Sequence, residues 1–312
     1  MCWKMQKMQG VSSMSEIIWN EITEAEEALF RQYYQKEQSK SCEHSFANNL
    51  LWAPFYKTKY SIVEECLVFK SGRQQLSVSF PLGKDRVKAA VDTLLDYFQK
   101  QDKPFCMHMV TKEQFVWLEA NYPGKFDIEY IRDAADYIYE SEKLITLSGK
   151  KLHGKRNHIN NFIKNYPDYT YESIDETNKD ECLAMAEEWR VQNGCKNDPD
   201  KQKEFCVTLR ALQSMETLGL TGGLIRAGGK VVAFSIGEPL SDDTYVVHIE
   251  KAYADIQGAY PMINQQFVLH EAANYRYINR EEDTGAEGLR KAKMSYYPVF
   301  MQEKGIVTLK EG

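Results

Sequence analysis

The segment TYVVHIEKAYADIQGAYPMINQQFVLHEAANY, residues 244–275, places a run rich in β-branched and aromatic residues before a loop and a long helix pattern. Two further β-rich runs, 221–229 and 230–240, precede it and meet at Gly228-Gly229, a pair typical of a hairpin turn. After it come a short strand pattern at 276–280, a helix pattern at 284–294 in which Thr284 and Glu287 have capping-box spacing, and a strand pattern at 298–309. This order predicts an α+β domain.

The first half of the chain repeats much of this order. A helix pattern at 23–38, with Thr23 and Glu26 as a capping box, precedes two strand patterns at 59–72 and 73–83. A helix at 84–100, a strand at 104–110, a helix at 113–121 and a strand at 126–133 follow. Because 312 residues suffice for two domains, we predict a flexible lead-in at 1–14, an N-terminal domain at 15–148 and a C-terminal domain at 149–312.

The composition is that of a globular protein, with 43% hydrophobic and 27% charged residues. A net charge of −6 argues against a surface built throughout for nucleic acid, so any polyanion site must be local. No apolar run is long enough for a transmembrane helix, and the N-terminus lacks the apolar core of a signal peptide. Seven cysteines without a C-x-x-C pair, and six histidines without metal-ligand spacing, predict a cytoplasmic protein with no metal site.

Three stretches carry a resemblance to a known family: KLHGKRNHINNF at 151–162, HIEKAYADIQGAYPMINQQF at 248–267 and INREEDTGAEGLRKAKMSYYPV at 278–299. They resemble a bacterial family related to the C-terminal catalytic domain of phosphatidylglycerol lysyltransferases. The resemblance spans nearly the whole chain and implies two tandem GNAT-like (acyl-CoA N-acyltransferase) domains, with mixed central sheets flanked by helices. It also implies acyltransferase chemistry, because those lysyltransferases move an amino acid from aminoacyl-tRNA to a lipid head group.

The segment 143–164 holds five lysines, one arginine and no acid, which is the strongest charge asymmetry in the chain. Its helix pattern buries a stripe that includes Ile159 and Phe162. We predict that a basic set lines a groove between the two halves and binds a phosphate, a carboxylate or the tRNA acceptor end. This set consists of Lys151, Lys155, Arg156 and His158. The alternative is a solvated basic helix without a ligand.

Alternation along the strand at 244–254 puts His248 and Glu250 on one face, where they can share a cleft. The resemblance implies that a general base sits on this strand, so both residues are catalytic candidates. Tyr296, just before Pro298, is the candidate general acid for the leaving group. The alternative is that the strand residues form only an exposed polar edge.

The loop before the long helix offers Gln257 and Gly258, whose position at a helix start favours an anion or an oxyanion. GNAT enzymes that use coenzyme A usually show the richer pattern R/Q-x-x-G-x-G/A, and Pro261 lacks an N–H, so we expect weak pyrophosphate binding. Arg290 and Lys293, one helical turn apart, are predicted to hold a donor phosphate together. Complementarity of these charges to the helix dipole is the alternative.

These observations predict that the C-terminal domain is active, whereas the N-terminal domain is degenerate and serves as a structural or lid domain. The expected reaction is aminoacyl transfer, from aminoacyl-tRNA to an amine or hydroxyl acceptor such as a lipid head group or a small molecule, without a required cofactor. A coenzyme A thioester donor and a non-catalytic ligand-binding module are the alternatives. Peripheral contact with a membrane is compatible with this reaction.

Overall fold

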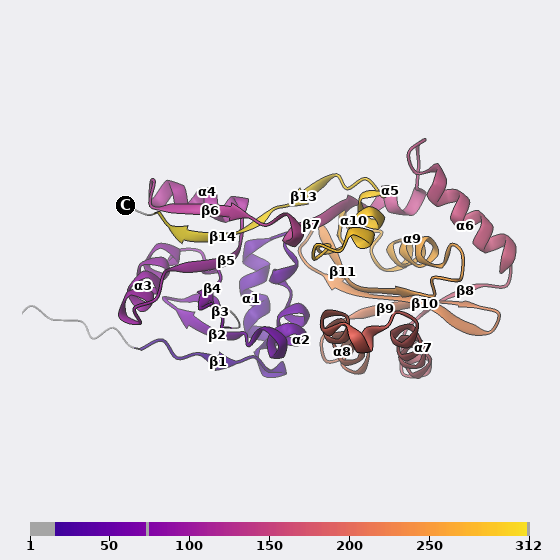
Figure 1. The fold of residues 1–312 in the computed structure, drawn as a ribbon, viewed down its shortest axis with the longest axis horizontal. Helices are drawn as coiled ribbons and strands as arrows, with labels where there is room; N and C mark the ends of the chain where they lie inside the picture. The colour runs from indigo at the N-terminus through magenta and orange to yellow at the C-terminus, as the bar shows by residue number, and fades with distance from the viewer. Residues whose placement is uncertain (1–15, 73–74, 311–312) are drawn as a thin grey trace, which may run out of the picture.

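The computed structural model of the protein describes residues 16–72 and 75–310. Two mixed seven-stranded sheets form two lobes along the long axis of the molecule, each flanked by helices (Figure 1). The predicted α+β class, with mixed sheets flanked by helices, is confirmed. The predicted lead-in at 1–14 lies outside the described residues.

The N-terminal lobe carries the first sheet. In spatial order its strands are β1 (Asn20–Glu21), β2 (Lys59–Val63), β3 (Cys66–Ser71), β4 (Ser77–Val78), β5 (Cys106–Thr111), β14 (Lys304–Leu309) and β6 (Phe126–Tyr130). Its helices are η1 (Glu24–Glu26), α1 (Glu27–Glu37), η2 (Cys42–His44), α2 (Phe46–Tyr56), α3 (Val87–Lys100), α4 (Lys112–Asn121) and η3 (Arg132–Ala134). The Thr23–Glu26 capping box predicted at the first helix is present.

The C-terminal lobe carries the second sheet. In spatial order its strands are β13 (Phe300–Gln302), β7 (Asp136–Glu140), β12 (Tyr277–Asn279), β11 (Thr244–Ala252), β10 (Lys230–Pro239), β9 (Thr221–Ala227) and β8 (Thr170–Ser173). Its helices are α5 (Ser141–Thr146), α6 (His153–Asn165), α7 (Lys179–Gln192), η4 (Cys195–Asn197), α8 (Pro199–Gln213), α9 (Ala259–Glu271) and α10 (Glu287–Met294). In Figure 1, α9 and α6 lie on one side of this sheet and α7 and α8 on the other. The helix α10 begins without the predicted Thr284–Glu287 box, because Thr284 adopts a left-handed conformation and Ala286 is the N-cap.

The two sheets exchange strands, so their division differs from the predicted boundary at 148/149. Strand β7, within the predicted N-terminal domain, pairs with β12 and β13 of the second sheet. The final strand pattern at 298–309 is split: β13 pairs with β7, whereas β14 crosses back and lies between β5 and β6 of the first sheet. The chain therefore crosses between the lobes twice, once from β6 into β7 and once from β13 back into β14.

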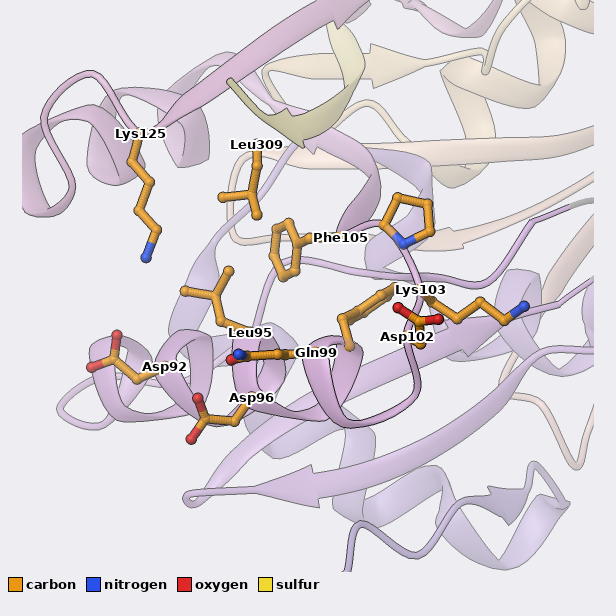
Figure 2. Close-up of a pocket in the computed structure, with 11 residues that line it drawn as sticks. Asp92, Leu95, Asp96, Gln99, Asp102, Lys103, Phe105, Lys125 and Leu309 are labelled. Atoms are coloured by element: carbon orange, nitrogen blue, oxygen red, sulfur yellow. The ribbon is translucent and has the colours of Figure 1, made fainter. Parts of the chain in front are cut away.

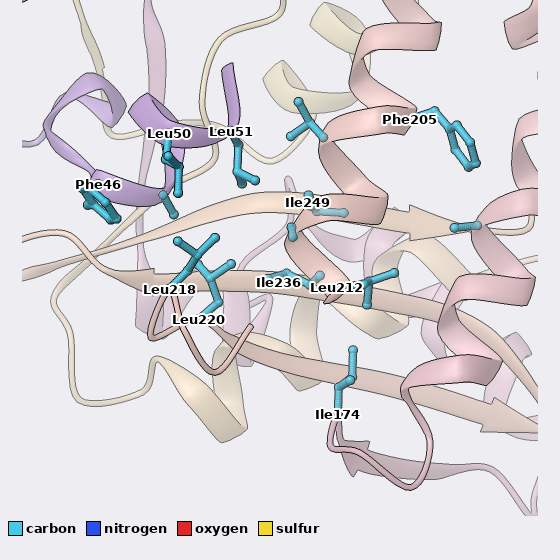
Figure 3. Close-up of a cluster of buried hydrophobic side chains, with 14 of the residues drawn as sticks. Phe46, Leu50, Leu51, Ile174, Phe205, Leu212, Leu218, Leu220, Ile236 and Ile249 are labelled. Atoms are coloured by element: carbon cyan, nitrogen blue, oxygen red, sulfur yellow. The ribbon is translucent and has the colours of Figure 1, made fainter. Parts of the chain in front are cut away.

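A shared apolar core joins the lobes. Phe46 and Leu51 of α2 belong to the same cluster as Leu212 of α8 and Ile236 and Ile249 on the facing sheet (Figure 3). Burial of such side chains contributes about 1.5–3 kcal/mol each, so the interface between the lobes is a part of the folded core. Among the described residues, none of the helices combines the length and the apolar character that crossing a bilayer requires.

Candidate active site

A β-bulge in β11 separates the two predicted catalytic residues. Ser235 and Ile236 of β10 pair with Glu250 and Ile249, but the next pair is Gly237 with Val247, which leaves His248 as the extra residue. A Cβ on Gly237 would lie 2.2 Å from the carbonyl oxygen of Val246, so only glycine fits this turn of the strand. The bulge interrupts the alternation, and His248 and Glu250 contact different groups. The prediction of one shared cleft is corrected accordingly.

Glu250 faces α9 and the end of β12. Arg280, the residue directly after β12, donates from Nη2 to Glu250 Oε1 at 2.8 Å. Asn264 of α9 donates from Nδ2 to the second carboxylate oxygen at 3.1 Å. The pairing of β11 with β12 ends at Val246 and Asn279, so Glu250 and Arg280 meet beyond the last paired residues of the two strands. A carboxylate held by two donors in this way has a fixed orientation.

An aromatic ring and two cations complete the cluster. The ammonium of Lys155 lies 4.1 Å from the ring centroid of Tyr296, and the guanidinium of Arg280 lies 4.9 Å from the same centroid. Tyr139 meets this ring edge-on at 6.4 Å between centroids. We call Glu250, Asn264, Arg280, Tyr296 and Lys155 the Glu250 cluster. It combines one anion, two cations, an amide and a phenol.

Burial sets the protonation states in this cluster. It raises the pKa of Tyr296 well above the usual value for a phenol, although the nearby charge of Arg280 lowers it in part. Burial, followed by the charge of Arg280, lowers the pKa of Lys155, and Glu250 partly offsets this. Burial also opposes the charge of Arg280, but Glu250 and the neighbouring tyrosines raise its pKa overall. Tyr296 is therefore protonated and Arg280 positively charged at neutral pH.

Three polar atoms around Glu250 are buried without a hydrogen-bond partner in the described part of the chain. They are Nη1 of Arg280, Oδ1 of Asn264 and Oγ of Ser235, the residue paired with Glu250 across the sheet. An unpaired buried polar atom costs about 1–3 kcal/mol, and native proteins rarely tolerate several together. The set contains donors and acceptors, which is the complement that a polar ligand needs.

The predicted basic set is only partly at this site. Lys155 belongs to the Glu250 cluster, whereas Arg156 donates to the carbonyl oxygens of Leu147 and Gly149 and closes the end of α5. Lys151 is exposed, with its ammonium 5.1 Å from the ring centroid of Tyr297, and His158 is also exposed. The predicted role of Arg156 as an anion ligand is corrected, because its Nη1 group binds the backbone at the end of α5.

The start of α9 is covered. Gly258, the N-cap, has φ +86°, and a Cβ there would lie 2.3 Å from the carbonyl oxygen of His158 on α6. The N–H of Ala259 already donates to the carbonyl of Ile256, and Pro261 has no N–H. Glycine is thus required for the packing of α6 on α9, and the predicted anion site at Gly258 is corrected. Gln257 is exposed beside it.

The predicted phosphate pair on α10 is also corrected. Arg290 makes a two-point contact with Asp283, with Nε to Oδ2 at 2.8 Å and Nη2 to Oδ1 at 2.9 Å, and it also contacts Asp133. Lys293 is buried and donates to the backbone carbonyls of Arg280 and Glu282. Arg290 and Lys293 therefore stabilise the conformation of the 280–283 loop.

His248 lies in a second polar group between the lobes. Its Nδ1 is 2.7 Å from Glu281 Oε1, and its Nε2 is 3.1 Å from Glu238 Oε1 and 3.3 Å from Ser45 Oγ. Burial would lower the pKa of His248, but hydrogen bonds to the two glutamates raise it to about 10. The imidazole is therefore charged at neutral pH, and its ring nitrogens are engaged. The predicted base role is left to Glu250.

Arg280 and Asn264 were absent from the predicted site. Asn264 offered a sequence signal, because it is a polar residue within the buried face of a helix that otherwise carries Met262, Ile263 and Phe267. Arg280 offered another, because it directly follows a short strand pattern, and residues at strand ends commonly carry function.

Among the residues that the structure describes, Cys42, Asp136 and Glu282 form the group that could surround a metal ion, since their ligand atoms lie within 4.8 Å of one another. The ammonium of Lys304 lies 2.8 Å from Asp136 Oδ1 and 3.6 Å from Cys42 Sγ. Lys304 already supplies positive charge at this position, so we assign no metal role to the group.

A cavity of about 800 Å³ lies beside the end of α3 in the N-terminal lobe (Figure 2). Asp92, Gln99 and Lys125 are among its lining residues, and none of the Glu250 cluster is. Asp92 already accepts from Tyr122 at 2.7 Å, so we assign no catalytic role to this cavity.

Comparisons with known proteins identify relatives of this architecture. Residues 34–307 match the family model described as phosphatidylglycerol lysyltransferase, C-terminal. A crystal structure of a conserved protein of unknown function from Bacteroides thetaiotaomicron is 40% identical, with a TM-score of 0.90, and the match covers 95% of this chain and 100% of that one.

Two further relatives are more distant. The C-terminal domain of a putative lysylphosphatidylglycerol synthetase from Agrobacterium fabrum is 12% identical, with a TM-score of 0.63 and 93% of each chain covered, which shows a common fold. An uncharacterised protein of Mycoplasmoides gallisepticum is 27% identical over 192 residues, and the match spans 59% of this chain and 59% of that curated relative.

Proposed function

This chain belongs to the family of the phosphatidylglycerol lysyltransferase C-terminal domain, and on that premise we propose that it transfers an aminoacyl group from aminoacyl-tRNA to an amine or hydroxyl acceptor. The proposed reaction centre is the Glu250 cluster. Acyl transfer needs a base for the attacking group, a proton donor for the leaving group and positive charge near the developing oxyanion. Glu250, Tyr296 and the pair Arg280 and Lys155 provide these three elements in one place.

The observation that carries the proposal is the set of unpartnered polar atoms around Glu250. Arg280 Nη1, Asn264 Oδ1 and Ser235 Oγ are buried, and no other described residue satisfies them. A bound ester with its α-amino group offers both acceptors and donors, so it can satisfy all three. A purely structural ion pair between Glu250 and Arg280 gives no reason for leaving them unpaired.

The proposed step proceeds as follows in chemical terms. The acceptor nitrogen or oxygen attacks the ester carbonyl carbon and forms a new C–N or C–O bond, while its N–H or O–H bond breaks and the proton passes to Glu250. The oxyanion of the tetrahedral intermediate lies near Arg280 and Lys155. Cleavage of the ester C–O bond releases the ribose oxygen of the tRNA, which takes its proton from Tyr296. Transfer of the proton from Glu250 to the Tyr296 oxygen then restores both groups. An aminoacyl ester is already activated, so the step as proposed requires no cofactor.

The start of α9 favours tRNA over coenzyme A as the donor. Gly258 is covered by α6, Ala259 N–H is already bonded, and Pro261 has no N–H, so a pyrophosphate finds few free donors there. The α5–α6 segment presents Lys150, Lys151 and other exposed cations without an acid between 143 and 164, a surface suited to a polyanion. A coenzyme A thioester donor remains the alternative.

The region of α10 and β13 favours a lipid head group over a soluble acceptor. Met294, Tyr297 and Val299 are 45%, 51% and 48% exposed, and Tyr297 directly follows Tyr296 of the cluster. Lys151 lies over the Tyr297 ring. Exposed apolar and aromatic side chains beside cations suit the surface of an anionic bilayer. A soluble amine or peptide is the alternative acceptor.

The test is an assay of aminoacyl transfer with radiolabelled aminoacyl-tRNA and vesicles of anionic lipid. We expect a labelled lipid product whose formation falls at least about 100-fold in Glu250→Gln and Tyr296→Phe, the usual range for loss of a general acid or base. Binding of tRNA should persist in both variants and weaken steeply as salt rises. The matched controls are Glu188→Gln and Tyr253→Phe, a hydrogen-bonded pair of the same residue types on the α7 side of the sheet.

Two outcomes would overturn parts of the proposal. Transfer from acetyl-coenzyme A with no use of tRNA would assign the chain to the coenzyme A-dependent class. Ligand binding without turnover of either donor, across lipid, amine and peptide acceptors, would make the protein a non-catalytic binding module.

A further inference from the structure

A chain of buried polar contacts runs from the N-terminal lobe to the loop that carries Arg280. Ser45, the N-cap of α2, donates from Oγ to Glu238 Oε1 at 2.5 Å. Glu238 and Glu281 then contact the opposite ring nitrogens of His248, at 3.1 and 2.7 Å. Glu238, in the middle of this series of contacts, is only 1% exposed. Nothing in the proposed reaction uses these residues.

The order Ser45, His248, Glu281 has the connectivity of a nucleophile, a base and an orienting acid. The local geometry argues against that role. Glu238 accepts the Ser45 hydroxyl proton, so the hydroxyl is directed away from the imidazole. The imidazole is charged because two carboxylates face it, and a charged imidazole cannot accept a proton. This series of polar contacts must therefore act by holding the contacting residues in place.

The polar contacts of Ser45, Glu238, His248 and Glu281 hold the 280–283 loop in place. Glu281 has φ +56°, a left-handed conformation that costs a residue with a side chain about 1–2 kcal/mol. Its N–H donates to Asn279 Oδ1 at 2.6 Å, and its carbonyl accepts from Tyr137 N–H at 3.1 Å. This conformation sends the Glu281 side chain to His248 and the preceding Arg280 side chain to Glu250.

We propose that His248 is a positioning residue, which through Glu281 fixes the 280–283 loop so that the guanidinium of Arg280 faces Glu250. The significance of this for catalysis rests on the proposed function. The positioning itself is a property of the free protein. It also makes the N-terminal lobe part of the site, because Ser45 orients Glu238 against His248.

The charges facing His248 explain why it is needed. Glu238 approaches from β10 and Glu281 from the 280–283 loop, while Ser45 approaches from α2. On the far side of Glu238, Arg31 of α1 lies 3.5 Å from Oε2 and is already bonded to Glu27. Without the imidazolium, two carboxylates face each other at the lobe interface. Their repulsion favours release of Glu281, whose backbone conformation is already costly.

The experiment compares His248→Gln with the double variant His248→Gln/Glu238→Gln. The measurement is the rotation rate of the Arg280 guanidinium about its Nε–Cζ bond, from nitrogen-15 NMR of arginine-labelled protein without any ligand. The Arg280 signals are assigned by their loss in Arg280→Lys. We expect H248Q to speed this rotation about tenfold or more, since the loop is released. The double variant should return most of the way to the wild-type rate, because one of the two repelling carboxylates is gone.

The control is His270→Gln, at the exposed end of α9, where His270 stacks on Tyr171 at 4.2 Å between ring centroids. If H248Q leaves the Arg280 rotation unchanged, or if adding Glu238→Gln gives no recovery, the positioning role is wrong. If H248Q fails to fold, Glu281→Gln tests the same link, and unchanged rotation in that variant also overturns it. Because no substrate is present, a lack of transferase activity would contradict the proposed function alone.

Discussion

Replacing Lys304 by methionine should destabilise the protein strongly. The Lys304 side chain is 0% exposed, and its ammonium lies 2.8 Å from Asp136 Oδ1 and 2.7 Å from Glu43 Oε1. Burial opposes the charge of Lys304, but Asp136 and the other neighbouring acids raise its pKa well above the usual value. Methionine preserves the length and apolar stem of lysine and removes the charge. The variant therefore leaves Asp136, itself 0% exposed, without its cation.

Breaking a buried pair from one side costs about 3–5 kcal/mol, which is a large share of a typical folding free energy of about 5–15 kcal/mol. The assay is urea unfolding followed by circular dichroism at pH 7. A control is Lys88→Met, because Lys88 pairs with Asp92 at the surface, with side chains 56% and 52% exposed, and exposed helix pairs are worth only about 0.3–0.5 kcal/mol.

Two results would refute this reasoning. One is a loss below about 1 kcal/mol in Lys304→Met, which is the range of a surface pair. The other is a double variant Lys304→Met/Asp136→Asn that is as unstable as the sum of the two single variants, because removing both charges should relieve the unpaired carboxylate.

Further predictions concern backbone fit and pH. Gly258→Ala should destabilise by about 2 kcal/mol or more in the same urea assay, since its φ of +86° and the His158 carbonyl 2.3 Å from a built Cβ both oppose a side chain. Burial raises the pKa of Glu282 to about 7, although Lys304 lowers it in part. The protonated Glu282 carboxyl therefore contributes fully to stability below about pH 4.5, and this contribution is lost as pH rises through 7. Glu282→Gln should accordingly raise the free energy of unfolding by about 1–3 kcal/mol at pH 8. Burial lowers the pKa of His248, but hydrogen bonds to the two glutamates raise it to about 10. The charged imidazole therefore contributes fully to the free energy of unfolding below about pH 6.5, and this contribution is lost as pH rises through 10. His248→Gln should flatten the fall in stability between these two pH values.

The strand and helix order was predictable because hydrophobic periodicity and turn residues report local structure directly. The patterns at 84–100 and 113–121 correspond to α3 and α4, and the Thr23–Glu26 box is present. The placement of strands in sheets was not predictable in this way. The strands β7 and β14 have ordinary strand sequences, and only the tertiary packing places each in the sheet of the other lobe.

The site was predicted in part, for a similar reason. Glu250, Tyr296 and Lys155 were named from sequence, and all three belong to one cluster. Strict alternation along the strand predicts that His248 and Glu250 share a face, whereas Gly237 in the partner strand is the sequence signal for the bulge that separates them.

The charged residues that proved structural could not be recognised from charge alone. Arg156 and Lys293 donate hydrogen bonds to backbone carbonyls, and the guanidinium of Arg290 pairs with Asp283. A helix-dipole interpretation accounted for the charges on α10 without identifying these partners. Such contacts depend on where a loop passes in three dimensions, which residue spacing does not report.

The return of β14 to the first sheet has a consequence for synthesis on the ribosome. The strand that separates β5 from β6 leaves the exit tunnel about 170 residues after β6 (130 to 304), so the N-terminal sheet stays incomplete until residues 304–309 have emerged. At about 5–20 residues per second, β5 and β6 wait about 10–40 s for their shared partner. Nascent chains stalled before residue 304 should therefore expose these two strand edges to chaperones, whereas chains in which residues 304–309 have emerged should not.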